Sequence, residues 1–312
     1  MTNPPSKDPD RDTYGANVEA VHRYAHDAMA CSCELYIVAA DARYAQQVAG
    51  AVFDEIDRLE QLLSHFIPHS DIAQLNALNP GHSIRVSPET VECLQLAAQL
   101  HKNTDGAFDV TYRNRSQTPQ TTSDVTCAPL VFDPCCHEVG IQTAGVTIDL
   151  GGLGKGYALD CAAAVLRDWE VKAALLHAGQ STALAVGHPP EASAWRVALR
   201  GGDIADKALY EVELSDRALS GSGQVLHGRH IIDPRTGQPV DEAREAWALA
   251  PTAAEADALS TAFMVMTPSE IDRCCRLRDR VSAILRTKSP REAKLSFLGD
   301  RTNLLNAEGE SA

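Results

Sequence analysis

Residues 148–160 read IDLGGLGKGYALD, and the four glycines within six positions constrain the fold more than any other segment. The short apolar run that ends at Leu150 predicts a strand over 146–150, and the residues that follow predict a helix over 155–168. Glycine permits a positive φ and close approach of another molecule, and free N–H groups at a helix N-terminus bind anions. The segment therefore predicts a phosphate-binding turn with an acid, Asp149, and a base, Lys155. A plain strand-to-helix turn with a surface lysine is the alternative.

The glycine turn does not match the usual nucleotide-binding motifs. A P-loop places Ser or Thr directly after its lysine, whereas Gly156 follows Lys155 here. The dinucleotide fingerprint GxGxxG, with an acid about twenty residues further on, is also missing. Ligands for a metal that accompanies a phosphate must therefore come from a later segment.

Composition excludes several classes of protein. The chain has 312 residues, a formal net charge of −14 and 44% apolar residues, which is ordinary for a globular protein. The negative charge disfavours nucleic acid as a partner, and no stretch approaches the roughly 20 apolar residues of a membrane span. The polar N-terminal sequence MTNPPSKDPDRDTYGAN lacks the apolar core of a signal peptide, so we expect an intracellular, cytoplasmic protein.

The nine cysteines include three close pairs, namely Cys31 with Cys33, Cys135 with Cys136, and Cys274 with Cys275. Neighbouring cysteines make poor disulfide partners, and no second pair lies at the spacing of a zinc finger. The pattern therefore favours free thiols over a structural metal.

The periodicity of apolar residues predicts an α+β fold, because strands occur in runs as well as between helices. We expect a disordered tail over 1–20, a single domain over 21–300, an exposed loop over 113–127 and a loose tail over 301–312. Helices are predicted at 43–66, 71–78, from Ser87 onwards, at 155–168 and at 253–266. Strands are predicted at 34–40, 146–150, 173–186, 194–200, 208–214, 246–250 and 281–286.

The helix predicted at 253–266 carries candidate metal ligands. Asp257 and Thr261 are four residues apart and therefore share one helix face, while Ser260 lies to the side. Magnesium prefers oxygen ligands and takes few from the protein when phosphates supply the rest. In the alternative, Thr261 bonds back to a helix carbonyl and Asp257 only complements the charge of the first turn.

Five segments in this order resemble the ApbE family of FAD:protein FMN transferases. They are LLSHFxxxSDIAQLN, DGAFDVT, IDLGGLGKGYALD, HIIDPRTGQP and AxxADALSTAF, and the resemblance runs from about Met29 to Met266. It implies an α+β fold with mixed or antiparallel sheets, packed helices and a flavin site between two intimately packed subdomains. It also implies Mg²⁺-dependent transfer of FMN from FAD to a Thr or Ser of an acceptor protein, with release of AMP. Some family members instead hydrolyse FAD to FMN and AMP.

The resemblance also implies roles for individual residues. His230 and Lys155 match positions for catalysis, with His230 taking the proton of the acceptor hydroxyl. Positions implied to contact FAD are Met29, Phe66, Asn76, Ala107, Phe108, Asp109, Asp149, Lys155 and Ile232. Positions implied to bind Mg²⁺ are Gly152, through its carbonyl, Asp257, Thr261 and, more weakly, Ser260.

The chain also departs from the family pattern. Residues 176–181 read LHAGQS where the family has NLGGD, so an acid is lost and His177 and Gln180 stand nearby. The start reads Met29-Ala30-Cys31 in place of MGT. These departures leave two further hypotheses open, an FAD pyrophosphatase and a non-catalytic flavin-binding protein. The partners we expect are FAD and an intracellular acceptor protein.

Overall fold

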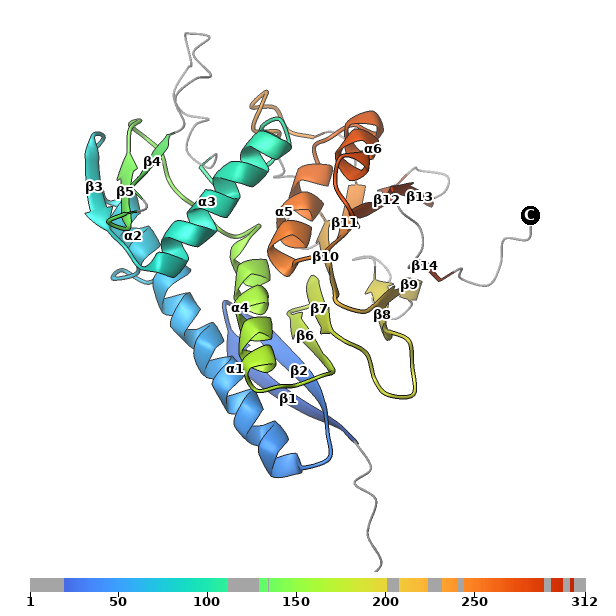
Figure 1. Cartoon of the computed structure of the whole chain (residues 1–312). Helices are drawn as coiled ribbons and strands as arrows, with labels where there is room; N and C mark the ends of the chain where they lie inside the picture. Colours follow the sequence, from blue (N-terminus) through green and yellow to red (C-terminus); the bar gives the residue numbers. More distant parts are fainter. Residues whose placement is uncertain are drawn as a thin grey trace, which may run out of the picture.

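This computed structural model describes residues 20–111, 129–133, 135–200, 208–223, 232–240, 244–288, 293–299 and 304–305. The described parts contain helices and antiparallel sheets, as expected for an α+β fold (Figure 1). No helix in these ranges is long and apolar enough to cross a membrane.

An eight-stranded sheet forms the centre of the molecule, and every strand pair in it is antiparallel. Its edges are β1 (Ala20–Ala28) and β13 (Ala293–Gly299). Between them lie, in spatial order, β2 (Cys31–Ala39), β6 (Ala174–Ala178), β7 (Thr182–Val186), β10 (Arg217–Gly223), β11 (Arg244–Ala250) and β12 (Ser282–Lys288).

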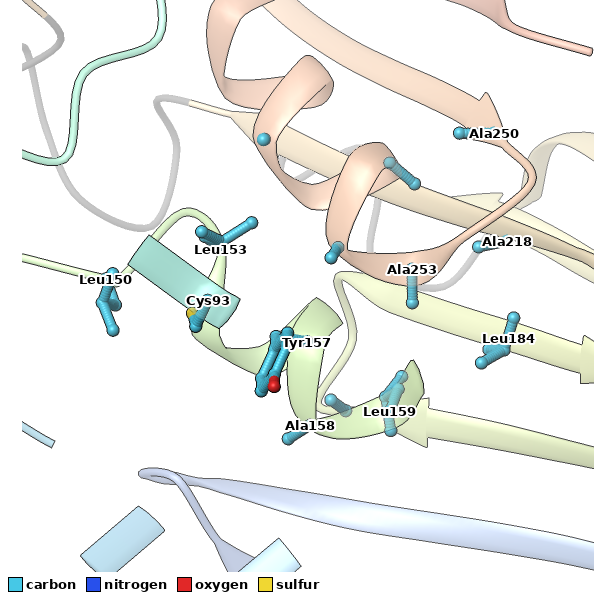
Figure 2. Packing of buried hydrophobic residues seen from close by; sticks show 14 of the residues in the cluster. Cys93, Leu150, Leu153, Tyr157, Ala158, Leu159, Leu184, Ala218, Ala250 and Ala253 are labelled. Carbon is cyan, nitrogen blue, oxygen red and sulfur yellow. The ribbon is translucent and has the colours of Figure 1, made fainter. Parts of the chain in front are cut away.

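Three helices pack against one face of this sheet and enclose the larger hydrophobic core (Figure 2). They are α1 (Ala42–Leu63), α4 (Gly154–Asp168) and α5 (Ala253–Phe263), and α4 contacts both of the others. In α1 the apolar residues recur at helical spacing and are buried, and the Asp41 side chain accepts the Arg43 N–H at the N-terminus. The observed helix ends at Leu63, so Phe66, which the sequence predicted as its last residue, lies beyond it.

A smaller sheet covers the opposite face. It consists of β14 (Leu304–Leu305), β9 (Ala208–Leu214) and β8 (Trp195–Arg200), and the residues of β8 alternate between buried and exposed. Trp195 and Tyr210 pack with Trp247 and Ile284 of the central sheet in a second core. Leu304 and Leu305 fall within the segment expected to be a loose tail, yet they pair with β9.

A third sheet stands at the end of the molecule near α2 and α3 (Figure 1). It contains β3 (His82–Arg85), β5 (Glu138–Ile141) and β4 (Leu130–Asp133). The helices are α2 (Asp71–Asn76) and α3 (Pro88–Asn103), each capped by a serine side chain, Ser70 and Ser87. One further helix, α6 (Pro268–Arg276), follows α5.

Two strand predictions are wrong. Residues 146–150 form no strand, because their backbone groups bond outside any ladder: Asn76 bonds both the N–H and the carbonyl of Ile148, and the Asp149 N–H donates to Val110. Residues 173–186 form two strands, because the chain turns at Gly179, whose φ of +59° favours glycine.

Candidate functional site

The glycine turn brings α4 unusually close to α5. A Cβ on Gly156 would lie 2.3 Å from the Ala253 carbonyl oxygen, so only glycine fits at this contact. None of the four glycines between Gly151 and Gly156 has a positive φ, so the expected use of positive φ is wrong in this turn. Close approach is the property that the turn requires.

Asp257 of α5 points at the N-terminus of α4. Its Oδ2 atom accepts the Gly156 N–H at 3.3 Å and lies 4.0 Å from the Lys155 Nζ, while Oδ1 accepts the Ser220 hydroxyl at 3.2 Å. Burial raises the pKa of Asp257, and the Lys155 ammonium and these hydrogen bonds oppose the rise. The structure therefore gathers a buried carboxylate, an ammonium group and the positive end of a helix at one place.

The hydroxyls of Thr261 and Ser260 lie next to this carboxylate. Thr261 donates to the Asp257 carbonyl at 3.2 Å, which is the bond back to a helix carbonyl that the alternative interpretation expects. Ser260 donates to the same carbonyl at 2.9 Å. Thr261 Oγ1 lies only 2.9 Å from where a Cβ on Gly152 would stand. The helix and the glycine turn, which are far apart in sequence, therefore meet at Gly152 and Thr261.

A small divalent cation fits this donor set. The candidate donors of Gly152, Asp257 and Thr261 are all oxygens, the ligand type that magnesium prefers, and a hydroxyl that donates its proton still has lone pairs. Within the described residues no group of three or more His, Cys, Asp or Glu side chains could hold a metal. A cation at this place would therefore depend on one carboxylate together with hydroxyl, carbonyl and phosphate oxygens.

Three candidate flavin contacts, Asn76, Asp149 and Phe66, are linked to the segment that leads into the turn. Asn76 holds Ile148 by two hydrogen bonds of 2.7 and 3.0 Å, which fixes the residue before Asp149. The Asp149 carboxylate accepts the Gly151 N–H at 2.9 Å and lies 3.8 Å from His65 Nδ1. The ring of His65 in turn contacts that of Phe66, which is 77% exposed and so presents an aromatic face to solvent.

The remaining candidate contacts surround the turn from other elements. Met29 lies in the β1–β2 turn, and its Cε is 3.7 Å from the Cβ position of Gly154. Phe108 is buried and lies 3.4 Å from the Cβ position of Gly152, next to the buried Ala107. Asp109 bonds the N–H and hydroxyl of Thr111.

The described contacts do not join Ile232 to these groups. Ile232 forms a bridge to Pro239 across the Asp233 turn, and Arg235 of that turn is 2.8 Å from Glu270 of α6. His230 lies outside the described residues. Its assignment stays a prediction from the sequence.

The altered LHAGQS segment places His177 and Gln180 in different surroundings. The strand alternation of β6 puts His177 on the side of the smaller core, where its ring meets the edge of Tyr36, and burial lowers its pKa. Gln180 is exposed in the turn beside Gly179, whose Cβ position is 3.3 Å from the Cβ of Cys31. His177 therefore faces away from the glycine turn. The eight cysteines among the described residues are all free thiols.

Sequence reasoning missed two serines of β10. Ser220 bonds Asp257, and Ser222 lies 2.9 Å from the Ser260 hydroxyl and 3.4 Å from that of Thr261. The alternating sequence Ser-Gly-Ser-Gly over 220–223 was a usable signal, because a period of two places both hydroxyls on the same face of a strand.

The architecture is that of solved flavin transferase structures. The apo form of the Pseudomonas stutzeri flavinyl transferase ApbE matches with a TM-score of 0.75 and 23% identity, over 90% of this chain and 95% of that one. The ApbE protein of Thermotoga maritima matches with a TM-score of 0.75 and 21% identity, over 89% and 97%. A model of the ApbE family matches residues 29–285, which is most of the chain. The chain belongs to the ApbE family.

Two relatives in the ApbE family bear the name FAD:protein FMN transferase. The FAD:protein FMN transferase of Klebsiella pneumoniae (strain 342) is 26% identical over 270 residues, 77% of this chain and 77% of the relative. The FAD:protein FMN transferase of Escherichia coli (strain K12) is 25% identical over 283 residues, 80% and 79% of the two chains. The family resemblance and the fold expected from the sequence are therefore confirmed.

Proposed function

We propose that this chain is an FAD:protein FMN transferase that uses Mg²⁺ and a Thr or Ser hydroxyl of an acceptor protein. The acceptor oxygen bonds to the phosphorus of the FMN half, the phosphoanhydride bond to AMP breaks, and the hydroxyl proton is released. Family membership and the shared name of the relatives support the transfer. The observation that most supports a diphosphate site is that Lys155, Asp257 and the N-terminus of α4 lie together.

These residues suit the chemistry of a diphosphate. The Lys155 ammonium and the first N–H groups of α4 would bind and orient the anionic phosphates, as helix N-termini do. Gly152, Asp257 and Thr261, with Ser260 beside them, would hold Mg²⁺. When bound, Mg²⁺ would offset the negative charge that develops on the phosphate oxygens. A chain with a net charge of −14 would otherwise repel its substrate.

Other groups would fix the flavin and the acceptor. The exposed ring of Phe66 and the side chain of Met29 would offer apolar surface to the flavin, and Asn76 fixes Ile148, the residue before Asp149. His230 stays our candidate for the base that takes the acceptor proton, on the sequence alone. An intracellular acceptor and a cytoplasmic location likewise stay predictions.

The test is a reconstitution with purified components. The chain is incubated with FAD, Mg²⁺ and a candidate acceptor, covalent flavin is read by in-gel fluorescence, and AMP is measured by chromatography. We expect acceptor labelling that stops with EDTA and with Asp257→Asn, while Asp168→Asn, an exposed site on α4, labels normally. AMP release without any acceptor would instead indicate hydrolysis. Intact FAD bound to an inactive wild-type protein would indicate a flavin carrier.

A further inference from the structure

Asp160 joins the glycine turn to the first turn of α5. It is the last residue of the IDLGGLGKGYALD segment and lies on α4, four residues after Gly156. Its Oδ1 atom accepts the Ala253 N–H at 2.7 Å and its Oδ2 atom accepts the Ala254 N–H at 2.9 Å. These are the first two residues of α5, whose N–H groups have no partner inside the helix.

The N-cap residue of α5, Thr252, reaches only the N–H group that follows those of Ala253 and Ala254. The Thr252 side chain accepts the Glu255 N–H at 3.2 Å, so Asp160 satisfies two donors that Thr252 does not reach. A carboxylate at this place also complements the positive end of α5. Asp160 of α4 therefore caps the N-terminus of α5, although Ala253 lies 93 residues further along the chain.

Asp160 and Gly156 both contact the start of α5 and so both fix its position against α4. They are four residues apart and so share one face of α4, and Gly156 lies against the backbone of Ala253 and Ala254. The Gly156 N–H bonds Asp257, one helical turn after Ala253. Figure 2 shows Ala253 at the start of α5 above the part of α4 that carries Tyr157, Ala158 and Leu159. Three hydrogen bonds thus run from one face of α4 to the first five residues of α5.

We propose that Asp160 is a positioning residue that sets the register of α5 against the glycine turn, so that Asp257 and Thr261 face Gly152. Without its carboxylate, two buried N–H groups lose their partner, and α5 can rotate or slide to recover hydrogen bonds with water. Such a movement changes the position of Thr261 relative to Gly152, where an added Cβ would now lie 2.9 Å from the Thr261 Oγ1 atom. The inference rests on the proposed function, because that function gives Asp257 and Thr261 their use.

The experiment compares Asp160→Asn with Asp168→Asn, the same change at an exposed position of the same helix. Asparagine keeps the shape but has one acceptor oxygen, and its NH₂ group opposes the second N–H donor. The readout is Mn²⁺ binding by electron paramagnetic resonance, with and without FAD, on protein whose helicity is checked by circular dichroism. Groups that orient metal ligands typically change metal affinity by about 10–100-fold, so we expect weaker Mn²⁺ binding of that size in Asp160→Asn. Asp168→Asn should stay within about twofold of wild type.

A purely structural cap would give a different result. It would lower the denaturation midpoint of Asp160→Asn and leave the Mn²⁺ affinity of the folded protein at the wild-type value, which would overturn the proposal. Asp160→Ser, which keeps one shorter acceptor, covers the case in which the amide variant does not fold, and the same two outcomes apply. In turnover assays the apparent KM for Mg²⁺ should rise more than kcat falls.

The failure of this inference can be told apart from failure of the proposed function, because Mn²⁺ binding requires no acceptor protein. If wild type binds Mn²⁺ and Asp160→Asn weakens that binding, the positioning role holds even when no FMN is transferred. If wild type transfers FMN and Asp160→Asn binds Mn²⁺ as wild type does, only the positioning role is refuted.

Discussion

Replacing Gly156 with alanine tests how far the site depends on the contact between α4 and α5. The new Cβ would lie 2.3 Å from the Ala253 carbonyl oxygen and 2.7 Å from the Ala254 Cα, both backbone atoms that no rotamer change can move. Ordinary contact begins at 3.4 Å, so the two helices must separate by about 1.1 Å, the difference between 3.4 and 2.3 Å. Overpacking of this kind costs about 1–3 kcal/mol of unfolding free energy.

The effect on activity should exceed the effect on stability. The same displacement lengthens the Gly156–Asp257 hydrogen bond, now 3.3 Å, and carries Asp257 away from Lys155. A misplacement of about 1 Å at a reacting site can cost about 10²-fold in rate, so we expect a loss of that order in FMN transfer.

The assay pairs urea unfolding with initial rates of acceptor labelling, and Gly50→Ala is the matched control. Gly50 lies in α1, and a Cβ there has no atom within 4 Å. Alanine in a helix interior gains about 0.5–1 kcal/mol over glycine, so the control should be slightly more stable and fully active. A Gly156→Ala variant that matches wild type in both rate and unfolding would refute the argument from close approach.

Three further outcomes are expected. Asn76→Ala leaves the buried N–H and carbonyl of Ile148 unpaired, which should cost about 1–3 kcal/mol in urea unfolding; a loss below about 0.5 kcal/mol would contradict this. A hydrogen bond from Cys33 and the Lys155 ammonium lower the pKa of Cys31 to about 7, so its alkylation by iodoacetamide, followed by mass spectrometry, should be half-maximal near pH 7, and a midpoint near 9 would disagree. Burial raises the pKa of Asp160 to about 6, with Arg167 and Glu255 as the charged groups facing it. The folded state then holds this proton more tightly than the unfolded chain, so raising the pH from about 4 to 7 should remove up to about 3 kcal/mol of stability through Asp160. Denaturation curves of Asp160→Asn should lack this share and keep the share from Glu255 and Asp257, whose pKa values burial also raises.

Much of the fold and of the candidate site can be predicted from local patterns in the sequence. The apolar spacing of α1 and the start of α3 at Ser87 and Pro88 are local signals, and both helices form where such signals place them. The proximity of Gly152 and Thr261, by contrast, cannot be predicted from a local pattern. Periodicity gives each element by itself, and only the ordered family motifs indicated that these two belong together.

The errors arise where the backbone finds partners outside its own element. The apolar run at 146–150 has the composition of a strand, but the Asn76 side chain satisfies Ile148, and Asn76 is 72 residues away in the sequence. The role of Asp160 was missed for the same reason, because its partners are backbone N–H groups of another helix. No pattern in a single sequence reports a hydrogen bond to a distant backbone.

The most direct test of the account is a crystal structure of the chain with FAD and Mn²⁺, in which anomalous scattering locates the metal. We predict a metal peak bound by the Asp257 carboxylate and the Thr261 hydroxyl, beside the glycine turn, with the FAD diphosphate completing its coordination. A metal peak or a diphosphate bound away from α5 and the glycine turn would contradict the account.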